Sequence, residues 1–211
     1  MDFYHQIFGL ASFLIGLWGT TVYISSIFRG ETRPHVYTHL VWGLISAIAF
    51  FAQVYDGAGA GCWAIGLTAA ACLFQSGLAL KYGEKNITPT DKIALVTALV
   101  AIAAWIVTQD PLLSVILASL IDVVAFYPTF RKSWEKPWEE NLSAYNIANV
   151  KLALSIVAIS HFSLVTTLFP AFCLAVNLAF VLWCLWRRQA IVSRFPWAHK
   201  RALSRVFASI S

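Results

Sequence analysis

Charged residues are scarce in this sequence of 211 residues, of which only 12% are Asp, Glu, Lys or Arg. A soluble domain averages about 25%, so the shortage argues against a water-soluble enzyme and excludes a disordered chain or a coiled coil. The four cysteines, at positions 62, 72, 173 and 184, are too few for a disulfide-stapled secreted domain and lack the CxxC spacing of a zinc site. Catalytic signatures such as HExxH and GxSxG are also missing. The sequence therefore predicts no enzyme, no metal site and no cofactor.

Apolar residues make up 59% of the chain and are collected in long runs. A helix needs about 20 apolar residues to cross a bilayer. The longest uncharged run, 152–186, is too long for one crossing, and Pro170 predicts a break within it because proline cannot donate a helical hydrogen bond. The sequence therefore predicts seven transmembrane helices, over residues 7–27, 38–55, 62–81, 92–108, 112–130, 143–166 and 171–187.

Basic residues are distributed unevenly among the predicted loops. Apart from Lys151, all Lys and Arg residues fall in or beside the first, third and fifth loops or in the C-terminal tail. None falls in the N-terminus or in the second, fourth and sixth loops. Cytoplasmic loops carry the excess of Lys and Arg, so we expect the N-terminus outside and the C-terminus in the cytoplasm. The basic tail, 190–211, favours contact with anionic lipid over nucleic acid, because Phe195 and Trp197 alternate with its basic residues.

Two parts of the chain resemble each other at an offset of about one hundred residues. Cys72-Leu73 matches Cys173-Leu174 at an offset of 101, and the segment 22–30 matches 124–132 at an offset of 102. These matches relate the first three predicted helices to the last three, with one helix between them. Because the connector is a single helix, both triplets cross the membrane in the same direction, as in parallel repeats around an axis along the membrane normal. The expected units are 1–91 and 111–189 for the two triplets, 92–110 for the linker helix and 190–211 for the tail.

The segment 122–145, DVVAFYPTFRKSWEKPWEENLSAY, resembles a PQ-loop, with Pro128 followed by Thr129 in place of the signature Gln. With the 3+1+3 layout, the chain resembles the SWEET and PQ-loop superfamily of seven-helix membrane transporters. This resemblance implies alternating access, a gate near Pro128 and a solute contact at Asn177 in the last helix. The counterpart of Asn177 in the third helix is Ser76 or Gln75.

Two charged residues lie in the interior of predicted spans, away from the span ends. Asp122 is ten residues into its span, about 15 Å deep, and Lys151 lies at a similar depth in the next one. Leaving a lone charge at the bilayer centre costs at least about 2.5–3.5 kcal/mol, so a pair or a shared cavity is expected. Two interpretations stay open at this point: a solute or proton site, or a structural ion pair with Lys151 extending toward the cytoplasm. The other candidates for lining the cavity are polar or aromatic: Asn146, Asn149, Asn177, Trp42, Gln53, Gln75 and Tyr145.

The sequence thus predicts an all-α membrane protein that moves a small polar solute by alternating access, coupled to protons or cations through Asp122. The alternative is a non-transporting seven-helix receptor or assembly subunit that recruits a partner or lipid through the basic tail. The expected location is a bacterial inner (plasma) membrane. The sequence leaves a homo-oligomer open and gives no reason to expect nucleic acid.

Overall fold

A computed structural model describes residues 2–108 and 110–194, although a few side chains within these ranges, Pro128 among them, lie outside the description. The described residues are helical and contain no strand, which confirms the predicted all-α class. The α-helices are α1 (Asp2–Phe28), α2 (Val36–Tyr55), α3 (Trp63–Tyr82), α4 (Pro89–Thr108), α5 (Pro111–Glu135), α6 (Leu142–Val157) and α7 (Leu164–Arg194). Two 3-10 helices, η1 (Gly59–Cys62) and η2 (Pro137–Glu139), lie in the connections.

Five of the described segments are long and apolar enough to cross a membrane. They are Phe3–Phe28, Val36–Tyr55, Gly59–Tyr82, Pro111–Glu135 and Leu164–Ser193. Helix α6 is also apolar but has only 16 residues. The chain is therefore a multi-pass membrane protein in its composition and helix lengths.

The bundle exposes many large apolar side chains and buries polar ones, which is the reverse of the pattern in a soluble protein. Large apolar side chains such as Leu10, Leu14 and Trp18 of α1 are half or more exposed, and similar side chains cover the outer faces of α5 and α7. Polar side chains, including Asp122 and Lys151, are buried. A soluble monomer rarely exposes an apolar surface of this extent, whereas a lipid-facing helix requires one.

The predicted helix break at Pro170 is wrong. Helix α7 begins at Leu164 and continues through Pro170, whereas α6 ends already at Val157. The break is set by Ser163, whose Oγ accepts the N–H of Thr166 over 3.2 Å while Thr166 Oγ1 accepts the N–H of Ser163 over 2.9 Å. This reciprocal pair satisfies two backbone N–H groups as a capping box does, with Thr166 in place of the usual Glu or Gln, so the helix starts there.

Pro170 is accommodated because a neighbouring helix replaces the hydrogen bond it removes. A proline cannot donate to the carbonyl four residues earlier, which here belongs to Thr166. Gln53 of α2 donates Nε2–H to that carbonyl oxygen over 3.2 Å. In an apolar environment a proline is tolerated when another group satisfies the freed carbonyl in this way.

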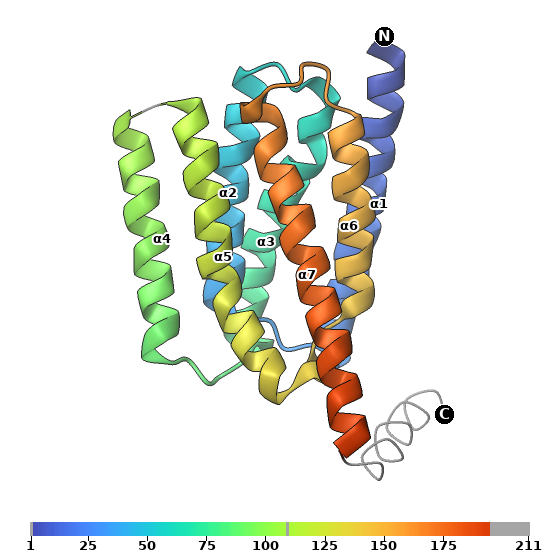
Figure 1. The fold of residues 1–211 in the computed structure, drawn as a ribbon, viewed down its shortest axis with the longest axis vertical. Coiled ribbons are helices and arrows are strands. Elements are labelled where there is room, and N and C mark those ends of the chain that lie inside the picture. The colour runs from blue at the N-terminus through green and yellow to red at the C-terminus, as the bar shows by residue number, and fades with distance from the viewer. Residues whose placement is uncertain (1, 109, 195–211) are drawn as a thin grey trace.

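The helices α1, α3, α2, α5, α7 and α6 form a closed ring in that order, each packing on the next, and α6 returns to α1. Helix α4 stands outside the ring against α5 and α2 (Figure 1). The N-terminus and the α2–α3, α4–α5 and α6–α7 connections lie at one end of the bundle. The end of α7 and the other connections, 29–35, 83–88 and 136–141, lie at the other, which we call the basic end because the described Lys and Arg residues other than Lys151 gather there.

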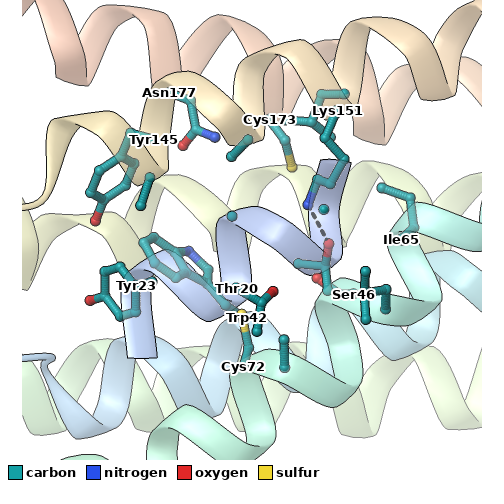
Figure 2. A pocket seen from close by; sticks show the side chains of 18 of the residues that line it. Thr20, Tyr23, Trp42, Ser46, Ile65, Cys72, Tyr145, Lys151, Cys173 and Asn177 are labelled. Atoms are coloured by element: carbon teal, nitrogen blue, oxygen red, sulfur yellow. Dashed lines mark hydrogen bonds between the residues drawn. The ribbon is translucent and has the colours of Figure 1, made fainter. Parts of the chain in front are cut away.

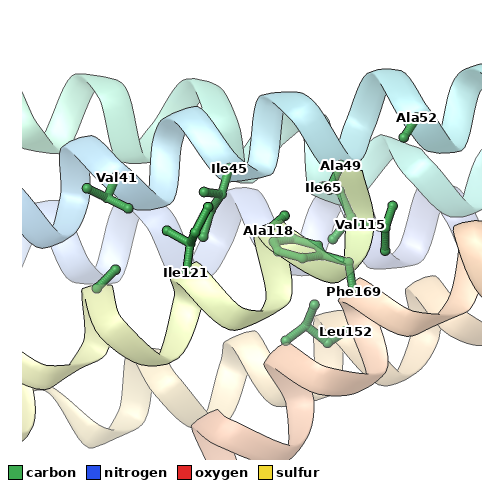
Figure 3. Packing of buried hydrophobic residues seen from close by; sticks show 11 residues of the cluster. Val41, Ile45, Ala49, Ala52, Ile65, Val115, Ala118, Ile121, Leu152 and Phe169 are labelled. Carbon is green, nitrogen blue, oxygen red and sulfur yellow. The ribbon is translucent and has the colours of Figure 1, made fainter. Parts of the chain in front are cut away.

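The largest apolar cluster lies between α2 and α5 (Figure 3). Its α2 residues, Val41, Ile45, Ala49 and Ala52, recur every three or four positions and so share one face of the helix. Helix α5 faces them with Val115, Ala118, Ile121 and Ala125. Several of these side chains are alanine, and small residues allow the backbones of membrane helices to approach closely. Asp122 follows Ile121 in α5 and so lies beside this seam.

Candidate functional site

The six helices of the ring line a partly open cavity of about 150 Å³ (Figure 2). All six contribute to its lining, and none of the lining residues belongs to α4. A water needs about 10–15 Å³ on this measure, so the cavity has room for about ten water-sized groups. This is the volume of a small solute.

Asp122 of α5 lines the cavity, and its side chain is almost fully buried. Its Oδ2 atom has no hydrogen-bond partner. The indole N–H of Trp42, on α2, is the polar group beside this carboxyl, and it too is buried without completing a hydrogen bond. Buried polar groups in proteins are nearly always hydrogen-bonded. The Trp42 N–H lies where it can donate to the Asp122 carboxyl, and the remaining acceptor capacity of that carboxyl on the cavity wall can bind a ligand.

Lys151 of α6 also lines the cavity (Figure 2). Its Nζ donates to Oγ1 of Thr68 on α3 over 2.6 Å. A Cβ at Gly16 of α1 would lie 2.7 Å from Lys151 Cδ, so the lysine stem passes through space that this glycine leaves open. Ser12 Oγ holds the Lys151 carbonyl over 2.7 Å. The ammonium therefore points into the bundle.

Asp122 and Lys151 share the cavity but do not form an ion pair with each other. Of the two interpretations left open by the sequence, the structural pair is the one that the geometry contradicts. Two opposite charges on one cavity, each without a charged partner among the described residues, are positioned for a third component.

Other candidates predicted from the sequence divide into two groups. Those that line the cavity with Asp122 and Lys151 are Trp42, Gln75, Tyr145 and Asn177. Gln53, Asn146 and Asn149 do not line it. Asn146 is exposed, and Asn149 is buried with both amide atoms unpartnered.

The prediction that Gln53 lines the cavity is wrong, because its amide holds the Thr166 carbonyl instead. The side chain of Pro128 lies outside the described residues, while α5 continues through that position to Glu135 without ending.

Several lining residues were not expected from the sequence. They are Thr20, Tyr23, His39, Ser46, Thr68, Cys72 and Cys173. The internal repeat contained a signal for some of them. Cys72 and Cys173, the matched pair at offset 101, face the cavity from α3 and α7, and Thr20 stands at offset 102 from Asp122.

A buried ion pair lies between the cavity and the basic end. Tyr145 lines the cavity, and its hydroxyl lies 3.5 Å from Oε2 of Glu140. Glu140 Oε1 pairs with Lys132 Nζ at 2.5 Å, and both side chains are at most 4% exposed. Lys132 also donates to the carbonyl of Arg33 over 2.7 Å. Burial raises the pKa of Glu140 above its usual range, and the Lys132 ammonium opposes that shift. The pair thus joins α5 to the 29–35 and 136–141 connections.

Helix α7 is attached to the same place. The guanidinium of Arg188 donates to the carbonyl of Pro137 over 2.8 Å and to that of Glu140 over 3.0 Å. Arg187 donates to the Trp134 carbonyl over 2.8 Å. Movement of α5 relative to α7 at the basic end would therefore have to break several polar contacts together.

The opposite end is joined by backbone packing. A Cβ at Gly9 of α1 would lie 2.5 Å from Ala60 Cβ, and one at Gly61 would lie 2.9 Å from Ile159 Cα. Ser155 Oγ donates to the Gly61 carbonyl over 2.6 Å. The non-helical segment 158–163 completes the short helix α6 here by packing against η1. Ile159 of this segment is buried, and the Ser160 N–H donates to the Ala58 carbonyl over 3.1 Å.

The described residues hold no cluster of three or more His, Cys, Asp or Glu side chains that could bind a metal ion. The cavity offers instead a carboxyl, an ammonium, an indole N–H, amides and hydroxyls, which can bind and orient a polar solute. Comparisons with protein-family models, curated proteins and solved structures find no match to this chain.

Proposed function

We propose that this protein is a membrane carrier that moves a small polar solute by alternating access, with the solute held between Asp122 and Lys151. The observation that carries the proposal is the pair of opposite, mutually unpaired charges on one interior cavity of a bundle whose outside is apolar. Intramembrane charges are costly, and where they occur they typically face a cavity and mark a substrate or ion pathway.

The architecture that we propose for this carrier is two parallel triplets, α1–α3 and α5–α7, joined by α4. Exchanging α1 with α5, α2 with α6 and α3 with α7 leaves the set of contacts around the ring unchanged. The 101- and 102-residue sequence offsets relate the same helices. Both observations support a seven-span 3+1+3 carrier, as does the resemblance of segment 122–145 to a PQ-loop of the SWEET and PQ-loop superfamily.

We assign the basic end to the cytoplasm because cytoplasmic loops are enriched in Lys and Arg. The N-terminus then lies outside, and a bacterial inner membrane is the proposed location. In this orientation the Lys132–Glu140 pair is the inner gate and the packed segments η1 and 158–163 form the outer gate. Rocking of one triplet against the other would open them alternately.

Asp122 is the proposed coupling group, because a carboxyl can bind a proton or a cation while the cavity faces one side and release it on the other. The test uses full-length protein in proteoliposomes that contain a pH-sensitive dye. Amino acids, amines, carboxylates and sugars are added outside in turn, with and without a pH gradient. We expect at least one class to enter and to change the internal pH.

Asp122→Asn should abolish the solute-dependent pH change. The matched control is Asp110→Asn, because Asp110 caps α5 through Oδ1 at 2.8 Å from the Leu112 nitrogen and an asparagine oxygen can do the same. An undiminished pH change in Asp122→Asn would contradict coupling. Absence of flux for every class in the wild type would contradict transport and favour the non-transporting receptor.

A further inference from the structure

We infer that the cavity selects a zwitterion, a solute with one cationic and one anionic group, and that it places the cation at Asp122 and the anion at Lys151. This inference rests on the proposed function because it concerns the same cavity. It adds the charge class and the orientation of the ligand.

The half of the site that would bind the cationic group of the ligand is a carboxyl flanked by aromatic rings. Phe126 follows Asp122 by one helical turn, so the two side chains share a face of α5. The ring of Trp42 packs edge-on against Phe126, with the centroids 4.8 Å apart. Both rings and Asp122 line the cavity. A cation is attracted to a carboxylate and to the faces of aromatic rings, and this combination suits an organic ammonium.

The half of the site that would bind the anionic group of the ligand is an ammonium with unused donors. Lys151 gives one hydrogen bond, to Thr68 Oγ1, among the described residues. An ammonium has three donors, so two remain for a ligand. Thr68 in turn donates to the Ala64 carbonyl over 2.8 Å, which orients its oxygen toward Lys151. The amine is thus held at one place and keeps capacity to bind a carboxylate or a similar anion.

The balance of charge favours a zwitterion over the other ligand classes when both groups are charged. A cation alone would leave Lys151 unpaired, an anion alone would leave Asp122 unpaired, and a neutral sugar would leave both unpaired. An unpaired buried charge is strongly unfavourable. A zwitterion satisfies both groups and adds no net charge to the interior.

The remaining lining limits size and polarity. Ile65, Leu152 and Phe169 form an apolar part of the wall and belong to the main apolar cluster. With space for about ten water-sized groups, the cavity accepts a zwitterion that has a short apolar portion.

The experiment measures binding to purified full-length protein in detergent by calorimetry. The probes are two zwitterions, leucine and 5-aminopentanoate, and two single-charge analogues, isoamylamine and 4-methylpentanoate. We expect at least one zwitterion to bind the wild type at least about 30-fold more tightly than either analogue, as expected for truncating one partner of a buried charge pair.

Two variants test the orientation. Asp122→Asn should weaken zwitterion binding and make 4-methylpentanoate the preferred single-charge probe, while Lys151→Met should make isoamylamine preferred. Thr68→Val keeps both charges, so it should retain zwitterion preference, and it provides a test if Lys151→Met does not fold. The controls Asp110→Asn and Lys136→Gln lie outside the cavity and should bind as the wild type does.

The inference is overturned if neither zwitterion binds, if a single-charge probe or a sugar binds as tightly, or if the two variants do not reverse the preference. Its failure is distinguishable from that of the proposed function. Charge-selective binding without flux contradicts only the carrier, whereas flux of a sugar that Lys151→Met leaves unchanged contradicts only the zwitterion.

Discussion

Lys132 and Glu140 form an ion pair, at 2.5 Å, in which both side chains are almost fully buried. Removing one member leaves the other as an uncompensated buried charge, which typically costs about 3–5 kcal/mol. We therefore expect Lys132→Met to lower the free energy of unfolding by about that amount. The double variant Lys132→Met/Glu140→Leu should lose less than Lys132→Met alone. Denaturation in mixed micelles measures both, and a double variant less stable than the single one would contradict this account.

The same pair should control access to the cavity from the basic end. Cys173 lines the cavity and Cys72 faces it from α3. In a Cys62→Ala/Cys184→Ala background, Glu140→Gln should speed the labelling of Cys173 by an impermeant maleimide applied at the basic end. Labelling rates in oriented vesicles test this. Glu139→Gln is the control, and equal rates in the two variants would show that the pair does not gate the cavity.

Gln53 should matter only because Pro170 is present. Gln53→Leu leaves the buried Thr166 carbonyl unsatisfied and should cost about 1–3 kcal/mol. Pro170→Ala restores an N–H that can donate to that carbonyl, so the cost of Gln53→Leu should fall in this background. A double-mutant cycle measures the coupling. Gln75→Leu, on another helix, should be additive with Pro170→Ala, and additivity for Gln53 as well would rule out the proposed compensation.

Glu84 should make stability depend on pH. Although partial burial opposes the effect, hydrogen bonds from the Asn86 N–H, Lys136 and the Lys85 N–H hold the pKa of Glu84 below its usual value. A carboxyl with a lowered pKa in the folded state stabilises the fold above its ordinary pKa, about 4.3. That contribution is lost as the pH falls through the folded pKa.

The melting temperature of Glu84→Gln should therefore lie below that of the wild type at neutral pH, and the two should converge in acid. Melting curves between neutral and acidic pH test this. Glu31→Gln alters an exposed pair with Arg29 and should have a smaller effect. A difference that persists unchanged into acid would contradict the role of the Glu84 charge.

The sequence predicts most of the helices because lipid imposes long apolar runs, and it identifies Asp122 and Lys151 because charges in such runs are rare. It does not predict where α7 starts, because Pro170 carries a general cost that Gln53, remote in the chain, offsets. Ser163 is the local signal that was available, because serine favours the N-cap position of a helix. The sequence also could not predict the two partners of Lys132, because no periodic pattern relates Lys132 to Glu140 or to the carbonyl of Arg33.

Gly16 has no side chain, yet the space that it leaves open determines where the Lys151 ammonium lies. The lysine stem passes through the gap at this position on its way to Thr68. Even one methyl group there would push the amine away from the hydroxyl. The electrostatic character of the interior is therefore adjustable from α1, by a change that neither adds nor removes a charge.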